Sequence, residues 1–491
     1  MVATGRVDDR LMHRRDLYIG GRWVAPVGGG TFPVVSPSTE EVVGQAPRAT
    51  DADGDRAVAA ARAAFQDGPW PAMAPDERAG VLARAADLLA QRAADIAGVT
   101  VDEMGCPVSQ ATASQTGLVA PVFRYYADLI RSFAFERRVE AGDRSGLVTQ
   151  EPVGVVAAIV PWNSPVMLSA WKLAPALAAG CTAVVKPPPE APLSNFVLAE
   201  ALDEAGVPAG VVNVVPGGRD LGEHLVTHRG TDKVAFTGST AAGRRIMSLC
   251  AEQVKRVSLE LGGKSAAVVL DDADLGTVVP RVVGGTMHLA GQSCGAHTRL
   301  LVPRSRYAEA LDAAAAAAAA VPYGDPHDPA TVVGPLVAER QRDRVEGYIG
   351  SAVEAGARVV TGGRRPEHLP RGWYVPPTIL GDVDNGMRVA QEEIFGPVLC
   401  LIAYEGDDEA VRIANDSQYG LSGGVWSADP ARALATARRV RTGSIAVNGS
   451  YPPFPAVPFG GFKQSGLGRE LGPEGLAGYL EPRSIGLPAG L

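Results

Sequence analysis

The segment Gly291-Gln292-Ser293-Cys294-Gly295 holds two side chains that could act as nucleophiles, and small residues surround them. Small neighbours would let either side chain reach into a cavity. A lone cysteine is most often a small buried hydrophobe, but a cysteine thiolate is also a potent nucleophile. The segment therefore predicts a nucleophilic site at Cys294.

The same string also fits G-x-S-x-G, the turn that presents the nucleophile of many serine hydrolases. In that interpretation Ser293 is the nucleophile, a β-strand precedes it and a histidine lies well downstream. Residues 286–290 are not strand-like, and the last histidine, His368, lies far from the C-terminus. The serine hydrolase stays as the alternative, and the cysteine nucleophile is favoured.

Three polar residues stand at the ends of short apolar runs. Glu260 leads into a Gly-Gly turn, Asn163 follows Pro161 and Trp162, and Lys186 ends another run. A polar group at the carboxyl end of a parallel strand faces the crevice where ligands bind. Each residue alone would also suit a helix cap or a loop charge. The three together predict a ligand site at the carboxyl ends of these strands.

A glycine turn at residues 236–240, which includes Gly238 and Ser239, joins a strand to a helix, and Gly243 follows. The backbone N–H groups of a helix N-terminus could receive a pyrophosphate there. Such turns also occur simply to let a strand and a helix pack closely. By itself the turn is weak evidence for a nucleotide.

These segments need a framework of alternating strands and helices, and residues 153–260 supply one. Apolar runs predict strands at 153–160, 182–185, 211–215, 233–236 and 256–259. Between them, helical periodicity predicts helices at 165–179, 194–205, 221–227 and 240–250. The alternation predicts a doubly wound parallel sheet of nucleotide-binding type.

Residues 264–440 repeat the alternation, which predicts a second α/β domain and a cleft between the two. Its strands are expected at 266–270, 299–302, 358–361 and 398–403. The alanine-rich stretch after Leu311 is predicted as a helix because alanine is the best helix former. Helices over 53–65 and 75–104 would cover the first sheet. Residues 132–150 and the tail after Gly472 would form an accessory sheet.

Composition sets the class of protein. At roughly 150 residues per domain, 491 residues suggest about three domains or two large ones. A net charge of −8 disfavours nucleic acid and anionic membrane as partners. Apolar runs fall far short of the roughly 20 residues that span a bilayer. Five scattered cysteines and a charged start without an apolar leader favour the cytoplasm.

In their order and spacing, these motifs resemble the aldehyde dehydrogenase superfamily, from about Leu17 to the end of the chain. The matching segments are PWN at 161–163, WKLAPAL at 171–177, VKP at 185–187, FTGS at 236–239, ELGGK at 260–264, GQSC at 291–294, EEIFGP at 392–397 and PFGGFKQSG at 458–466.

The resemblance implies an aldehyde dehydrogenase-like α/β fold with three parts. They are a Rossmann-type dinucleotide-binding domain (1–131 and 151–260), an α/β catalytic domain (261–471) and a small β oligomerisation element (132–150 and 472–491). A homodimer or homotetramer is implied, and no metal site is expected.

The resemblance also implies a reaction, the oxidation of an aldehyde to a carboxylic acid with NAD. Cys294 would be the nucleophile, and Glu260 would be the general base that activates water for hydrolysis. The Asn163 amide and the Cys294 backbone N–H would hold the oxyanion, and Lys172 would belong to the catalytic group. A member of the fold without turnover is a further alternative, and the intact Cys294, Glu260 and Asn163 argue against it.

For the cofactor, the resemblance implies Lys186 at the adenosine ribose, Ser239 at the pyrophosphate, Glu393 at the nicotinamide ribose and Phe395 against that end. Many relatives carry an acid three residues after the lysine, where this chain has Pro189. NAD is therefore expected, with NADP also usable. The other cofactor-binding positions implied are Pro161, Trp162, Gly238 and Leu261.

The substrate channel would be lined by a mixture of apolar and small residues without Arg or Lys. Ser164 stands where many relatives carry a large aromatic, which predicts a wide channel. We expect a bulky, uncharged aldehyde, aromatic or of medium chain length, and neither a second carboxylate nor a betaine aldehyde. The lining positions are Ser164, Leu168, Trp171, Ser293, Gly295 and Phe459.

Overall fold

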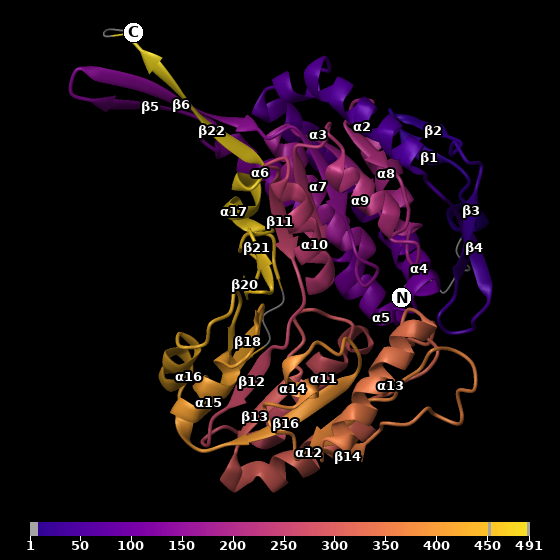
Figure 1. The fold of residues 1–491 in the computed structure, drawn as a ribbon, viewed down its shortest axis with the longest axis vertical. Coiled ribbons are helices and arrows are strands. Elements are labelled where there is room, and N and C mark those ends of the chain that lie inside the picture. The colour runs from indigo at the N-terminus through magenta and orange to yellow at the C-terminus, as the bar shows by residue number, and fades with distance from the viewer. Residues whose placement is uncertain (1–7, 450–452, 489–491) are drawn as a thin grey trace.

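The computed structural model describes residues 8–449 and 453–488. The first seven residues of the charged start and the last three residues of the tail, on which the leader and accessory-sheet predictions partly rest, lie outside the described residues. Two large sheets form the two halves of the molecule, and a narrow three-stranded sheet extends from one of them (Figure 1). None of the helices in the described ranges is long and apolar enough to cross a membrane.

The first sheet has eight strands, and its five central strands are parallel in the doubly wound order that the sequence predicts. Antiparallel strands extend it at both edges. In spatial order the strands are β2 (Arg22–Val24), β1 (Leu17–Ile19), β9 (Val212–Val214), β8 (Thr182–Lys186), β7 (Val155–Ile159), β10 (Lys233–Thr237), β11 (Arg256–Glu260) and β21 (Gly466–Leu467).

Helices cover both faces of this sheet because alternate strand residues point to opposite sides. Val156 and Ala158 pack into the cluster under α3, α4, α6, α7 and α8, whereas Val155 and Ala157 pack into the cluster under α2, α9 and α10. The helices are α2 (Asp51–Gln66), α3 (Pro75–Gln91), α4 (Ala93–Met104), α6 (Val119–Ser132), α7 (Pro165–Ala179), α8 (Ser194–Glu204), α9 (Arg219–Thr227) and α10 (Thr240–Ala251).

One helix prediction was wrong. The single helix expected at 75–104 is interrupted at Arg92, whose backbone leaves the helical region with φ −90° and ψ 7°. The change of direction lets α3 pack on the sheet while α4 carries Glu103 to the start of α8. There the Glu103 carboxylate accepts hydrogen bonds from the backbone N–H groups of Leu193 and Ser194.

The second sheet has seven strands and forms the other half of the molecule. Its alanine-rich segment is helical, as predicted. The strands, in spatial order, are β14 (Arg358–Thr361), β15 (Thr378–Gly381), β16 (Val398–Tyr404), β13 (Arg299–Pro303), β12 (Ala266–Val269), β18 (Gly423–Trp426) and β19 (Ala446–Val447). The helices are α11 (Leu275–Met287), α12 (Tyr307–Ala319), α13 (Glu339–Glu354), α14 (Arg388–Gln391), α15 (Gly406–Asn415) and α16 (Pro430–Ala437).

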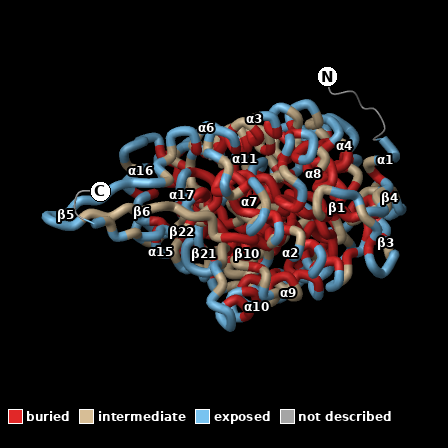
Figure 2. The backbone as a smooth tube through the Cα atoms, turned by 90° about the horizontal axis from the view of Figure 1, so that it is seen from above, coloured by how far each residue is buried: buried red, intermediate tan, exposed pale blue. Residues whose placement is uncertain are grey.

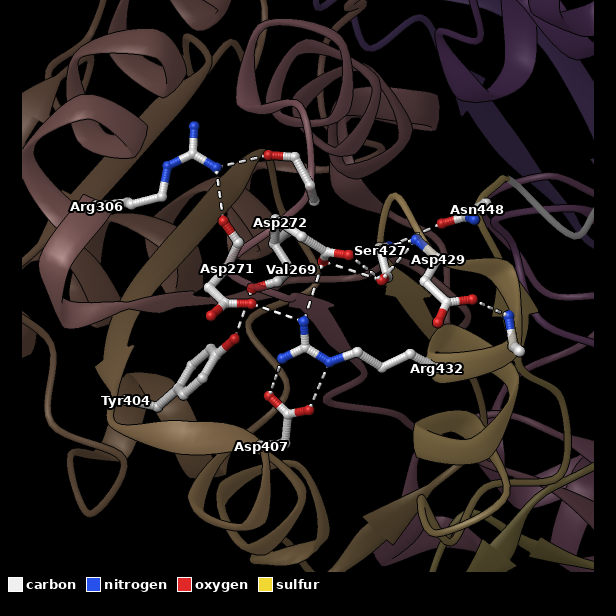
Figure 3. A network of polar contacts seen from close by, with 12 residues as sticks. Val269, Asp271, Asp272, Arg306, Tyr404, Asp407, Ser427, Asp429, Arg432 and Asn448 are labelled. Carbon is white, nitrogen blue, oxygen red and sulfur yellow. Dashed lines mark hydrogen bonds and ion pairs between the residues drawn. The ribbon is translucent and has the colours of Figure 1, made fainter.

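The carboxyl edge of the second sheet is closed by ion pairs (Figure 3). Arg432 donates to Asp407 at 2.8 and 2.9 Å and to Asp271 at 2.7 Å, which ties the loop that follows β12 to the first turn of α15. The Tyr404 hydroxyl donates to the Val269 carbonyl at 2.7 Å. This edge is therefore a structural tie, and the residues with expected chemistry lie at the opposite edge.

The accessory sheet predicted from 132–150 and the tail is present. Its strands β22 (Leu480–Leu487), β6 (Arg144–Pro152) and β5 (Glu136–Ala141) pair in that order, and β5 is exposed along its whole length at the tip of the projection (Figure 2). The remaining short elements are α1 (Asp9–Met12), β3 (Thr31–Val35), β4 (Val42–Pro47), α5 (Val108–Gln110), a π-helix (Ala111–Thr116), β17 (Tyr419–Gly420), β20 (Phe462–Lys463) and α17 (Gly472–Ala477).

Candidate active site

The carboxyl edge of the first sheet faces the amino edge of the second (Figure 1). The predicted site residues lie at the ends of strands on these two edges. Glu260 ends β11, and Asn163 follows β7. From the other half, Cys294 precedes β13 and Glu393 precedes β16. The Gly263 backbone lies so close to the Cys294 carbonyl that a side chain at position 263 would collide with it.

Cys294 follows a strained turn. Leu289 and Ala290 adopt left-handed conformations, with φ 51° and 54°, and Gly291 follows at φ 71°. Non-glycine residues in this region cost free energy and persist only where the surroundings impose them. Cys294 is partly buried against the first core cluster. Burial, followed by the charges of Glu393 and Glu260, raises the pKa of its thiol to about 12.

Asn163 reaches across the junction to the loop that carries Cys294. Its side chain is buried, and Nδ2 donates to the Gln292 carbonyl at 2.9 Å. An amide nitrogen has two N–H groups, so one remains for a ligand. The two predicted donors of an oxyanion hole, the Asn163 amide and the Cys294 N–H, therefore come from adjoining loops of different halves.

Glu260 is 3% exposed, and neither of its carboxylate oxygens has a hydrogen-bond partner among the described residues. Burial raises the pKa of Glu260 well above its ordinary value, and the charge of Glu470 adds to this effect. The charge of Lys172 acts in the opposite direction. An unpartnered buried carboxyl with a raised pKa marks a candidate functional site.

Lys172 does not contact Cys294 directly through any hydrogen bond found in the described residues. Its ammonium is fully buried, pairs with Glu470 Oε1 and donates to Thr237 Oγ1 at 2.5 Å. Thr237 ends β10, next to the glycine turn at Gly238. Lys172 thus contacts Glu470 and Thr237.

The residues predicted at the adenosine ribose and the pyrophosphate lie farther along the same sheet edge. Lys186 is buried and donates to the carbonyls of Gly217 at 2.7 Å and Pro187 at 3.3 Å. Burial lowers the pKa of its ammonium to about 8. An ammonium has three N–H donors, so one is spare for a ligand hydroxyl. Ser239 begins α10 as its N-cap, which leaves N-terminal N–H groups beside Gly238.

Beside Lys186 lies a cavity of about 480 Å³. Pro189, Gly217, Gly218 and Arg48 contribute to its lining, together with Asp51 and Asp220. A concave site of this size beside a buried lysine and two glycines fits the adenosine end of a dinucleotide.

The other cofactor-binding residues cluster near Cys294. Glu393 Oε1 accepts from the Gly263 N–H at 2.9 Å, and burial raises the pKa of Glu393 to about 7. The rings of Trp162 and Phe395 meet edge to face at 5.3 Å between centroids. Pro161 adjoins Trp162 and Leu261 follows Glu260, so both flank this end.

Three of the residues predicted to line the substrate channel lie in one buried cluster. Trp171 and Phe459 meet edge to face at 5.4 Å between ring centroids, and Leu168 belongs to the same buried cluster. Ser293 and Gly295 flank Cys294 and are partly exposed. Ser164 is 3% exposed, and its hydroxyl contacts Gln115, which occupies part of the space that a small residue leaves there.

The serine hydrolase alternative lacks its framework. The turn that presents a hydrolase serine requires a preceding strand, but a 3₁₀ turn (His288–Gly291) precedes Ser293. In the described part of the chain the Ser293 hydroxyl makes no hydrogen bond to a histidine; nearby His297 contacts Ser422 instead.

Four polar residues of the site escaped the sequence reasoning. Gln110, Gln115 and Gln292 hold the loops of Asn163 and Cys294, and Glu470 pairs with Lys172. Glu470 lies 298 residues from Lys172, so no local spacing could reveal the pair. The only local signals were the GQSC motif, which contains Gln292, and the two glutamines five positions apart.

The chain resembles known proteins along nearly its whole length. Residues 23–485 match the family model described as "Aldehyde dehydrogenase family". The chain is 48% identical to geranial dehydrogenase of Castellaniella defragrans over 96% of this chain and 98% of the relative.

Solved structures match equally well. An aldehyde dehydrogenase from Mycobacterium tuberculosis complexed with NAD+ superimposes with a TM-score of 0.96 at 45% identity, covering 98% of this chain and 99% of that one. A mutant of aldehyde dehydrogenase C from Pseudomonas syringae, complexed with NAD+ and octanal, gives a TM-score of 0.94 at 43% identity, covering 99% and 98%. The protein therefore belongs to the aldehyde dehydrogenase family.

Proposed function

We propose that the protein oxidises an aldehyde to a carboxylic acid with NAD+ and water, and releases NADH and a proton. The observation that carries this proposal is the meeting of Asn163 with the Cys294 loop, beside a buried Glu260 that has no hydrogen-bond partner in the described chain. Nucleophile, oxyanion donor and base thus adjoin the expected nicotinamide end.

Cys294 is the nucleophile in this proposal. A thiol with a pKa of about 12 is protonated at neutral pH, so it needs a base to become a thiolate. Glu260, or a bound water that it orients, accepts that proton. The sulfur then forms a bond to the aldehyde carbon, and the carbonyl oxygen becomes an oxyanion in a thiohemiacetal.

Two donors stabilise this oxyanion, the Asn163 side-chain amide and the Cys294 backbone N–H. Donors fixed in place before the reaction stabilise developing charge without reorganisation, and one such donor contributes about 10²- to 10³-fold to kcat. The bond from Asn163 to the Gln292 carbonyl supplies this preorganisation.

Bound NAD+ supplies the acceptor for the hydride that leaves the thiohemiacetal carbon. Lys186 and the α10 N-terminus at Gly238 and Ser239 would hold its adenosine and phosphate end. Glu393 would accept from the nicotinamide ribose hydroxyls, with Pro161, Trp162, Leu261 and Phe395 flanking that end. Pro189 removes a carboxylate that would repel a 2′-phosphate, so NADP is expected to be usable too.

The thioester left on Cys294 is then hydrolysed. Once the first proton has passed to solvent, Glu260 takes a proton from water as the hydroxide adds to the thioester carbon. That proton passes to the sulfur, so that Cys294 leaves as the thiol while the acid departs. The charge of Lys172 lowers the pKa of Glu260, and the charge of Glu470 raises it.

The substrate is proposed to be a bulky, uncharged aldehyde. Leu168, Trp171 and Phe459 provide apolar surface, and Ser293 and Gly295, which flank Cys294, are small and partly exposed. Two relatives support this class: one is named for geranial, and one was solved with octanal. Neither is charged.

We also propose the domain roles expected from the sequence, with 132–150 and 472–491 as the element through which two or four copies associate. The exposed edge strand β5 supports this role because an unpaired edge invites a partner strand. Light scattering that reports a fully active monomer would contradict it. All five cysteines carry free thiols, as suits a reducing compartment such as the cytoplasm.

The test is a panel of aldehydes, from acetaldehyde through hexanal and benzaldehyde to succinic semialdehyde, incubated with NAD or NADP. Formation of reduced cofactor with equimolar acid is the expected result. An enzyme that reduces neither cofactor with any aldehyde would overturn the proposal.

A further inference from the structure

A π-helix, Ala111–Thr116, lies between α5 and α6. Three hydroxyls, of Thr112, Ser114 and Thr116, donate to the carbonyls four residues before them. Such side-chain bonds compete with the regular helix ladder. π-helical turns are rare and recur at functional sites, so the neighbours of this turn are informative.

Gln115 in the π-helix is 1% exposed and reaches the loop that contains Asn163. Its Nε2 donates to Ser164 Oγ at 2.9 Å, and Ser164 Oγ donates to the Asn163 carbonyl at 2.8 Å. A hydroxyl has one proton, and Ser164 directs it at Asn163, so Ser164 must accept from Gln115. The two hydrogen bonds therefore point the same way, from Gln115 to Ser164 and from Ser164 to Asn163. We call this pair of bonds the relay, and it holds the Asn163 backbone in place.

Gln110, directly before the π-helix, reaches the loop that contains Cys294. Its Oε1 accepts from the Leu289 N–H at 2.8 Å, and its Nε2 donates to the Val332 carbonyl at 2.6 Å. Leu289 is one of the two residues that the fold holds in a left-handed conformation before Cys294. Gln110 therefore helps to impose the strained turn.

We propose that Gln110 and Gln115 are positioning residues that set the relative placement of the two oxyanion donors, Asn163 and the Cys294 N–H. The inference rests on the proposed function. It adds a pair of positioning residues, which the proposed reaction does not by itself require. The two donors come from different halves of the molecule, and one short segment touches both loops. Bonds between residues five apart define the π-helix, and five positions separate the two glutamines.

The chemistry gives the expected effect of losing this device. Misplacing a catalytic group by about 1 Å can cost roughly 10²-fold in rate. Because the oxyanion forms after binding, the loss should appear equally in kcat and kcat/KM and leave KM nearly unchanged. A merely structural role would loosen the fold or the channel and raise KM instead.

The test compares Gln115→Met, Ser164→Ala and Gln110→Met, of which Gln115→Met preserves side-chain length without a donor. Thr112→Val is the matched control, because Thr112 is exposed and, in the part of the chain that the structure describes, its hydroxyl bonds only the Val108 carbonyl. Each variant is measured for aldehyde oxidation, for ester hydrolysis by Cys294 without cofactor, for NADH binding by fluorescence and for melting temperature.

We expect the three site variants to lose about 10- to 100-fold in kcat for both reactions, with NADH binding unchanged and Thr112→Val within about twofold of the parent. The double variant Gln115→Met/Ser164→Ala should be no worse than either single variant, because both break one relay. Ser164→Thr, which restores the hydroxyl, should recover most of the rate lost in Ser164→Ala.

Several results would overturn the inference. Normal kcat in Gln115→Met and Gln110→Met, additive losses in the double variant, or a higher KM with unchanged kcat would each do so. If Gln115→Met does not fold, Ser164→Ala and Ser164→Thr still decide the relay. A parent enzyme that binds NADH but oxidises no aldehyde would instead refute the proposed function.

Discussion

Lys172 and Glu470 form a buried ion pair whose charges act on Glu260. The Lys172 ammonium also donates to Thr237, so it is fixed by two partners. Its charge favours the ionised form of Glu260, whereas burial and Glu470 favour the protonated form. The protonation state of the proposed base is therefore set by a balance that one substitution can tilt.

Lys172→Met should move the acid limb of the pH–kcat profile to higher pH. Glu260 works as a base when ionised, and removing the cation raises its pKa further, so a smaller fraction is ionised at neutral pH. The rate at neutral pH should fall, by at most the 10²- to 10⁴-fold that a positioned base contributes. Arg281→Met, on the exposed face of α11, serves as control, and an unshifted limb in Lys172→Met would contradict the coupling.

Cys294→Ala should abolish aldehyde oxidation, because no other described residue at this loop supplies a thiolate. Ser293→Ala should remain measurably active, and it is the matched control since it removes the rival nucleophile one residue away. Both are assayed by formation of reduced cofactor and by mass spectrometry of a trapped acyl-enzyme. Appreciable turnover by the Cys294 variant would refute the covalent mechanism.

Glu260→Gln should separate acylation from deacylation. If hydrolysis is its indispensable task, the variant forms about one equivalent of NADH per site in a burst and then stalls as the thioester. Stopped-flow absorbance measures the burst. A normal steady-state rate would rule out the role, and a missing burst would show that Glu260 is also needed to activate Cys294.

Much of the fold follows from the sequence because local signals agree with the tertiary structure. The helix Pro165–Ala179 has the predicted ends, since Pro165 suits its first turn and Gly180 takes the left-handed position after it, at φ 95°. β18 gave no signal because two of its four residues are glycine, which strands disfavour. Its stability comes from pairing with β12 and β19, which only the fold provides.

The site divides in the same way. Cys294, Glu260 and Asn163 stand in short motifs, so their order along the chain indicated them. Gln115 acts on Ser164 across 49 residues, and its contact depends on a π-helical turn that no hydrophobic pattern predicts. A positioning residue is recognised by its contacts in the folded protein. The spacing of residues along the sequence does not reveal those contacts.

Pro189→Glu should turn the enzyme against NADP. Pro189 borders the cavity beside Lys186 and Gly217, and a carboxylate there would repel a 2′-phosphate by about 1 to 4 kcal/mol at close range. We expect kcat/KM for NADP to fall about tenfold or more relative to NAD. Pro189→Gln, of similar size without charge, is the control. Equal losses in both variants, by kinetics and by NADPH fluorescence, would place the discrimination elsewhere.

The apolar wall formed by Trp171 and Phe459 should favour bulky, uncharged aldehydes. Hexanal and benzaldehyde should exceed acetaldehyde in kcat/KM, because burying apolar area stabilises the bound aldehyde by about 25 cal/mol per Å². Phe459→Ala should cost roughly tenfold for hexanal, equivalent to about 1.4 kcal/mol, and less for acetaldehyde. Phe462→Ala is the control, since that ring is 40% exposed. A higher kcat/KM for acetaldehyde or succinic semialdehyde than for hexanal and benzaldehyde would show that the wall does not select bulky, uncharged substrates.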